Sequence, residues 1–196
     1  AIESGKFAEE IVPFATTMKA TDKVTNVSRE REVTLDRDEG PRPDTTLAAV
    51  QRAFDRWEDD PGSNIDFTYG GVTNQGLPTV PGNELFDGVN VVSWMQPNQP
   101  YLALASWGIN HLGQVISFDI RVNQTLPWAA GAVAGRNDIE SVIAHEIGHA
   151  LGLDHTPASS ELMYFQIQTG TVKPLGAGDI SGARAMYPAP NPIPTA

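Results

Sequence analysis

Three of the four histidines of this 196-residue chain lie within eleven residues, from His145 to His155. On a helix, His145 and His149 lie one turn apart on the same face, about 6 Å apart along the axis, so both imidazoles can reach one Zn²⁺ ion. Gly152 can adopt a left-handed conformation that ends the helix and turns the chain back, which lets His155 reach the same ion. Three neutral imidazoles leave the fourth tetrahedral position open, as in catalytic zinc sites. The spacing therefore predicts a catalytic zinc site.

Glu146 follows the first of these histidines and points to a neighbouring face of the predicted helix. Its carboxylate can hydrogen-bond a metal-bound water without binding the metal itself. It could take the proton of that water as a general base and return it as a general acid. The alternative is an amphipathic core helix that happens to carry histidines. The coincidence of five spaced residue types favours the catalytic interpretation.

The string His-Glu-x-x-His-x-x-Gly-x-x-His, with Met163 eight residues after His155, resembles the metzincin clan of zinc endopeptidases. In that clan the methionine forms an apolar floor under the three imidazoles. Within the clan the chain is most similar to the matrixin (matrix metalloprotease-like) branch, over roughly residues 22–188. The resemblance implies an α+β fold, the zincin/metzincin catalytic domain. That domain has a twisted, mostly parallel sheet with an antiparallel edge strand, an N-terminal helix, an active-site helix and a C-terminal helix.

Local patterns predict where these elements lie. Asp44, Asp138 and Asp179 are expected to cap or begin the three helices, since aspartate is a favoured N-cap residue. Apolar residues recur at helical spacing after Asp44, and Pro61-Gly62 should close that helix. Short β-rich runs separated by Gly, Pro and Asn predict the strands. The expected elements are strands at 31–35, 65–69, 89–94, 102–105 and 115–122, and helices from 44, at 139–151 and at 179–186.

The matrixin resemblance also implies a substrate cleft. An extended peptide should pair with the edge strand, here Leu102, Ala103, Leu104 and Ala105, near Trp107, by main-chain hydrogen bonds. The pocket for the residue just after the scissile bond should be walled by the segment after Met163, here Tyr164, Phe165 and Ile167. These side chains are apolar, so Leu or Met is expected after the cut. Phe165 and Ile167 replace the proline and tyrosine usual in matrixins, so the wall differs from the usual one.

The expected metal content is one catalytic zinc. Animal matrixins carry a second, structural zinc, but its histidine positions correspond here to Leu104 and Ser117. Only His111 remains in that region, and one imidazole cannot make a closed four-ligand site. The 106–114 loop should therefore be held by packing and hydrogen bonds. Calcium is possible, because oxygen ligands leave weak sequence signatures. The acidic run at 58–60 is most simply a solvated helix end, with a calcium contact as the alternative.

Composition limits the partners. A net charge of −11 and a pI near 4.6 argue against nucleic acid and anionic membrane surfaces. No apolar run approaches the ~20 residues that span a bilayer, so no membrane insertion is expected. The chain has no cysteine, so it has no disulfide framework. We expect a secreted, extracellular monomer with an N-terminal extension at 1–21, the catalytic domain at 22–188 and a Pro-rich tail at 189–196.

The predicted function is zinc-dependent endopeptidase activity. The enzyme would hydrolyse internal bonds of extended protein or peptide substrates by Glu146-assisted attack of zinc-bound water. One alternative is a catalytically weak zinc-binding or interaction module of the same fold, although a structural zinc site has no use for Glu146. The other is a small-molecule metallohydrolase, which should need a closed pocket, whereas the cleft of this clan is open at both ends.

Overall fold

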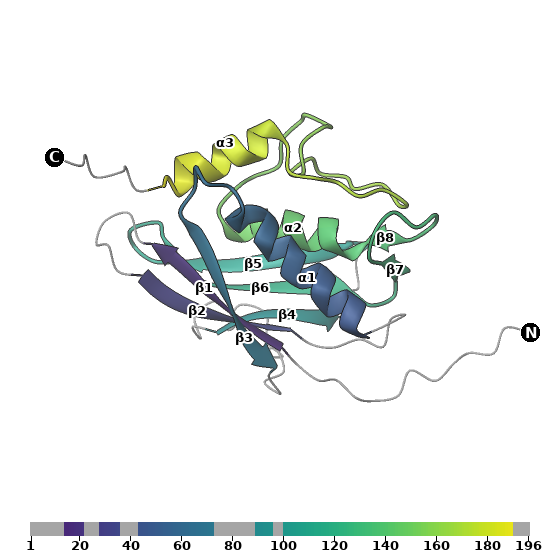
Figure 1. The fold of residues 1–196 in the computed structure, drawn as a ribbon, viewed down its shortest axis with the longest axis horizontal. Helices are drawn as coiled ribbons and strands as arrows, with labels where there is room; N and C mark the ends of the chain where they lie inside the picture. The colour runs from purple at the N-terminus through teal and green to yellow at the C-terminus, as the bar shows by residue number, and fades with distance from the viewer. Residues whose placement is uncertain (1–13, 22–27, 36–42, 73–88, 96–99, 190–196) are drawn as a thin grey trace, which may run out of the picture.

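The computed structural model describes residues 14–21, 28–35, 43–72, 89–95 and 100–189. A six-stranded mixed sheet carries helices α1 and α2 on one face, and α3 lies at the C-terminal end of α2 (Figure 1). The buried apolar side chains of both helices and of the central strands form one hydrophobic cluster. The predicted α+β fold is confirmed.

The sheet runs in the order β1-β3-β2-β4-β6-β5. Three neighbouring strand pairs are parallel, namely β2–β3, β2–β4 and β4–β6. At one edge of the sheet, β5 is antiparallel to β6. This is the predicted antiparallel edge strand. The strand bounds are β1 Phe14–Thr21, β2 Ser28–Leu35, β3 Ile65–Val72, β4 Val89–Met95, β5 Ala103–Ile109 and β6 Val115–Asn123, with the short pair β7 Trp128–Ala129 and β8 Asn137–Asp138.

β1 lies in the part of the chain that was expected to be an N-terminal extension. It pairs antiparallel with both β2 and β3, so residues 14–21 belong to the sheet. Residues 1–13 and 190–196, which hold the rest of that extension and most of the Pro-rich tail, lie outside the described residues. The proposed domain boundaries stay predictions.

α1 spans Pro43–Glu58 and packs beside α2. Proline suits the first position of a helix, because its missing N–H has no helical partner there. The prediction that Asp44 caps this helix was wrong, since Asp44 lies inside it. The indole N–H of Trp57 donates to the Ala144 carbonyl at 2.9 Å, which ties the buried face of α1 to the middle of α2.

α2 spans Ile139–Ala150, and Asp138 caps it as predicted by accepting from the Ser141 amide at 3.0 Å. Gly152 follows with φ +95°, the left-handed conformation that the sequence analysis required. α3 spans Ala177–Met186 and begins two residues before the expected Asp179. Within the described residues, no helix is long and apolar enough to cross a membrane.

Candidate active site

The three predicted metal-binding histidines converge at the end of α2. The Nε2 atoms of His145 and His149 each lie 3.1 Å from Nε2 of His155. His145 and His149 share one face of α2, and the turn at Gly152 returns the chain so that His155 reaches them. In the part of the chain that the structure describes, this is the one group of three or more histidine and acidic side chains placed to hold a metal ion.

Backbone carbonyls orient two of these rings. His145 donates from Nδ1 to the Leu162 carbonyl at 2.8 Å, and His149 donates from Nδ1 to the Leu153 carbonyl at 2.9 Å. A carbonyl can only accept, so the lone pair of each neutral ring is on Nε2 and faces the other histidines. Burial lowers the pKa of His145 to about 4 and also lowers the pKa of His149. Both rings are therefore held in the neutral form that metal binding requires.

This donor set fits zinc. Four ligands arranged tetrahedrally at about 2.0–2.1 Å from a zinc ion lie roughly 3.3 Å from one another. The two Nε2 separations from His155, both 3.1 Å, are close to that value, and the ligand atoms of the three histidines all lie within 4.8 Å of one another. The imidazole nitrogens are ligands that zinc favours, and three of them leave one position open.

Glu146 lies beside the histidines without joining them. Its side chain is 7% exposed and accepts a hydrogen bond from the Ala105 amide of β5 at 2.7 Å. Burial raises the pKa of Glu146 to about 7, and the bond from Ala105 opposes part of that rise. The carboxylate is thus held between α2 and the edge strand, inside the cleft and next to the three histidines.

Residues 160–164, which the family resemblance predicts to form a turn around Met163 (the Met-turn), pack under α2. Met163 is buried, and its sulfur lies against Gly148, between the two histidines of the helix. Asp179, which is also buried, accepts from the amides of Leu162 and Met163 at 2.6 and 3.1 Å. The Leu162 carbonyl is in turn the partner of His145, so α3 supports one of the three candidate metal ligands through the backbone of this turn. Met163 was predicted from the sequence, but this role of Asp179 was not.

A cleft of about 1180 Å³ runs across the histidines between β5 and the segment after Met163. Six of the seven predicted substrate-binding residues line it, namely Leu102, Ala103, Leu104, Ala105, Phe165 and Ile167. Tyr164 does not, because its ring packs against Phe165 at 4.5 Å between centroids and contacts Lys173. The cleft lining also includes residues that were not predicted from the sequence, among them Tyr101, Asn137 and Val142.

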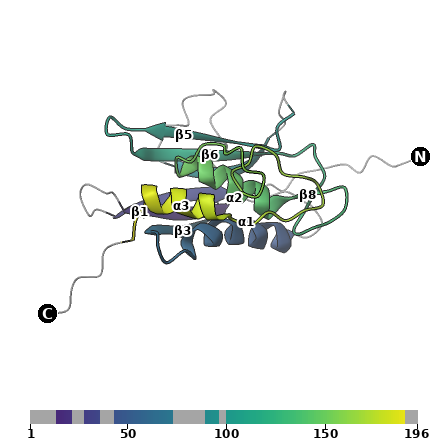
Figure 2. The ribbon, with the colours of Figure 1, turned by 90° about the horizontal axis from the view of Figure 1, so that it is seen from above.

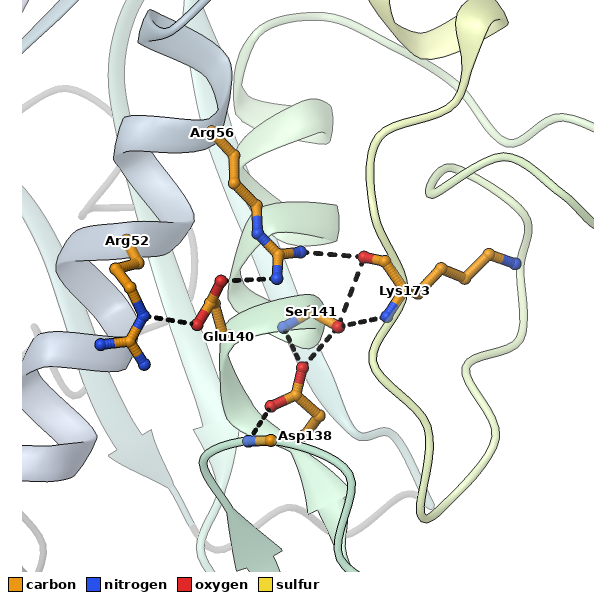
Figure 3. Close-up of polar contacts among 7 residues, drawn as sticks. Arg52, Arg56, Asp138, Glu140, Ser141 and Lys173 are labelled. Carbon is orange, nitrogen blue, oxygen red and sulfur yellow. Dashed lines mark hydrogen bonds and ion pairs between the residues drawn. The ribbon is translucent and has the colours of Figure 1, made fainter.

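Arg56 and Ser141 anchor the segment around Lys173, which follows the cleft-lining residues, to α1 and α2 (Figure 3). Arg52 and Arg56 of α1 both pair with Glu140 at the start of α2, at 2.8 and 2.5 Å. Arg56 also donates to the Lys173 carbonyl at 2.8 Å, and the Lys173 amide donates to the Ser141 hydroxyl at 2.7 Å. The start of α2 and the segment leading to α3 are therefore held together from both helices.

The turn between β5 and β6 is closed by backbone hydrogen bonds between Asn110 and residues 113–114 and by the Asn110 side chain. The Asn110 carbonyl oxygen accepts from the amides of Leu112 and Gln114 at 2.9 and 3.0 Å, and its NH₂ donates to the Gln114 side chain at 2.7 Å. The expected hydrogen bonds are present at 110–114, whereas residues 106–109 are strand rather than loop. His111 is exposed in this turn. The number of metal ions stays a prediction.

The acidic run at the end of α1 is not simply solvated, so that expectation was wrong. Glu58 accepts a hydrogen bond from the Phe67 amide of β3. Asp60 pairs with Arg184 of α3, at 2.5 and 2.9 Å for the two closest atom pairs. Two of the three carboxylates are thus used to hold α1 to its neighbours.

Comparison with known proteins agrees with this site. The sequence model of the matrixin family matches residues 86–188, more than half of the chain, and includes all three histidines, Glu146 and Met163. The chain therefore belongs to the matrixin family, as the resemblance predicted.

Its relatives include proteins of a virus, a plant and a mammal. A probable matrix metalloproteinase, 095L, of invertebrate iridescent virus 3 is 37% identical over 77 residues, which is 38% of this chain and 21% of the viral protein. Metalloendoproteinase 1-MMP of Arabidopsis thaliana is 45% identical over 56 residues, 28% of this chain and 15% of that protein. Human matrix metalloproteinase-16 is 29% identical over 167 residues, 76% of this chain and 25% of that protein. The matched regions thus span a quarter or less of these relatives.

Proposed function

We propose that the chain is a zinc-dependent endopeptidase that cleaves extended protein or peptide substrates. The observation that carries the proposal is the convergence of three Nε2 atoms within an open cleft that also holds the buried Glu146. His145, His149 and His155 would hold the zinc ion. When bound there, zinc would lower the pKa of a coordinated water and polarise the scissile carbonyl.

Glu146 acts as the proton carrier of the reaction. Its carboxylate accepts the proton of the attacking water and then passes it to the amine that leaves. The hydrogen bond from the Ala105 amide holds the carboxylate against the edge strand, so it keeps one position during both transfers. Burial raises the pKa of this carboxyl to about 7, which places proton gain and loss within reach at neutral pH.

The edge strand binds the substrate backbone. β5 is the last strand of the sheet, and an extended peptide that pairs with it lies across the histidines. The residue after the scissile bond would enter the part of the cleft lined by Leu102, Val142 and Ile167. These side chains favour an apolar residue there, such as Leu or Met. A secreted, monomeric enzyme remains the expectation from the family resemblance.

The test combines peptide digestion with elemental analysis. Wild-type protein purified without added metal is expected to hold one zinc and to cleave a proteome-derived peptide library before apolar residues. Glu146→Ala should keep the zinc, because its three ligands remain, and should lose at least ~10² in turnover. His149→Ala should lose both zinc and activity.

Each readout can contradict a separate part of the proposal. Zinc binding without peptide cleavage would support the alternative of a zinc-binding interaction module. Wild-type turnover by Glu146→Ala would remove this carboxylate from the mechanism. Two tightly held zinc ions per chain would show that the β5–β6 turn holds a second site.

A further inference from the structure

Three exposed apolar side chains continue the rim of the cleft beyond the metal-binding group. Trp107, Ile109 and Leu112 are 41%, 55% and 59% exposed, on β5 and the turn that follows it. Single exposed apolar residues are ordinary, but a contiguous group is typical of a binding surface. We refer to these three residues as the apolar ridge.

The end of α2 explains why the ridge is exposed. Ala103 and Ala105 lie on the face of β5 that α2 covers, and both are buried. Alternate residues of a strand share a face, so Trp107 continues the same row. Ile109 follows it after a register shift in the pairing with β6, between Gly108 and Ile109. The Trp107 ring stacks on His149 in the last turn of α2, with planes 13° apart and centroids 6.2 Å apart. The β5–β6 hairpin, which carries Ile109 as the last residue of β5, extends past the end of α2 (Figures 1 and 2).

This edge also lacks the charges that usually protect an edge strand. Residues 100–118 contain no Lys, Arg, Asp or Glu, in a chain that is 19% charged. Edge strands of soluble proteins commonly carry charged residues or proline, which prevent pairing with other chains. β5 is the terminal strand of the sheet order. A free strand edge beside apolar side chains is the combination that binds an extended peptide by strand addition.

We propose that the apolar ridge binds the amino-terminal part of an extended substrate, four or more residues before the scissile bond, and selects apolar side chains there. This inference rests on the proposed function. The Ala105 amide bonds to Glu146 and so marks the level of the reaction along β5. Ile109 lies four residues further along the strand, about 13 Å away at ~3.3 Å per residue.

The position of the ridge indicates which part of the substrate it contacts. The pocket for the residue after the cut is lined by Leu102 and Ile167, at the start of β5. The ridge lies beyond the opposite end of the histidine cluster, so it meets residues before the cut. Trp107 lines the cleft and also begins the ridge, so a substrate that stays extended passes directly from one to the other.

A pair of substrate lengths tests the inference. The short peptide has three residues before the cut and cannot reach Ile109. Two long peptides have eight residues before the cut. Their first five residues are drawn from Leu, Val and Phe in the apolar peptide and from Ser, Asn and Gly in the polar one. For the wild type, we expect kcat/KM to be about tenfold higher for the apolar long peptide than for the polar one, mostly through KM, because partial burial of two or three apolar side chains suffices for that factor.

The variants separate the ridge from the catalytic site. Ile109→Ser/Leu112→Ser should bring the ratio for the two long peptides close to one while leaving short-peptide cleavage, zinc content and thermal stability unchanged. The matched control Val133→Ser/Val172→Ser replaces two apolar residues that are 41% and 44% exposed away from the ridge. It should keep the tenfold ratio.

Two results would overturn the inference: equal cleavage of both long peptides by the wild type, or a ratio that survives the double substitution. Self-association of the wild type that the double substitution abolishes would assign the ridge to a dimer contact instead. Failure of the proposed function would appear separately, as no cleavage of any peptide. In that case the fluorescence anisotropy of labelled long peptides still tests the ridge. The wild type should bind the apolar long peptide more tightly than the polar one, and Ile109→Ser/Leu112→Ser should bind both equally.

Discussion

The sulfur of Met163 occupies the space that a side chain at Gly148 would need. Gly148 lies between the two histidines of α2, and the Trp57 ring closes the same space from α1. Glycine inside a helix costs roughly 0.5–1 kcal/mol relative to alanine. Here the missing side chain allows the Met-turn to approach the helix at the level of the imidazoles.

Gly148→Ala should therefore destabilise the protein, although alanine is the better helix former. Overpacking of a well-packed core costs about 1–3 kcal/mol, which outweighs the helix-propensity gain of ~1 kcal/mol at the upper end. Urea unfolding of the single variants and of Gly148→Ala/Met163→Ala measures the effect. The double variant should lose less than the sum of the single losses, since removing the sulfur relieves the overlap. Simple additivity would contradict this account.

Asp179 should affect both stability and zinc affinity. Its carboxylate accepts from the amides of Leu162, Met163 and Gly176, and hydrogen bonds to charged groups contribute about 1.5–3 kcal/mol each. Asp179→Ala should lower the free energy of unfolding by several kcal/mol, and Asp179→Asn by less, because one oxygen remains. Chelator competition should also show weaker zinc binding, because the Leu162 carbonyl would orient His145 less well. Unchanged zinc affinity in a folded Asp179→Asn variant would argue against this link.

Arg52 and Arg56 provide a matched comparison, because both contact Glu140. The Arg56 side chain is 19% exposed and also bonds to the Lys173 carbonyl, whereas the Arg52 side chain is 49% exposed. Exposed ion pairs contribute about 0–1 kcal/mol, and partly buried, hydrogen-bonded ones contribute more. Arg56→Met should therefore destabilise the protein more than Arg52→Met in thermal unfolding. Equal losses would show that the bond to Lys173 adds nothing.

Glu58 should make stability depend on pH. Burial raises its pKa to about 7 in the folded protein, helped by the charges of Asp66, Asp55 and Asp59, whereas an unfolded glutamate titrates near 4.5. The folded state thus holds this proton more tightly, so the group lowers stability as pH rises from about 4.5 to 7. Glu58→Gln can still accept from the Phe67 amide and should flatten that decline. Urea unfolding of the wild type and of Glu58→Gln at several pH values measures the decline. If the free energy of unfolding falls equally with pH in both proteins, Glu58 is not its cause.

The parts of the site that were predictable depend on local spacing. His145, His149 and the Asp138 cap follow helical periodicity, in which partners lie three or four residues apart, and Gly152 indicates the turn that returns His155. Tyr101, Asn137 and Val142 reach the cleft through tertiary packing, which leaves no periodic signal. Tyr164 was misplaced for a related reason: neighbouring residues of an irregular segment point in different directions, and only the contact with Lys173 shows which way this ring turns.

The pairing of Asp179 with the Met-turn was also beyond prediction, because seventeen residues separate it from Leu162. Aspartate near the start of a helix suggests a cap, and Asp179 does accept from the Gly176 amide. Its bonds to a second segment depend on where α3 packs. For α1, Asp44 offered a strong capping signal, yet the helix begins at Pro43, because proline is also favoured at a first position.

The Asn110 turn is stabilised within the hairpin that carries it. Every side-chain partner of Asn110 lies within four residues of it. These bonds therefore need no contact from α2 or α3, whereas the three histidines meet only where the chain turns back at Gly152.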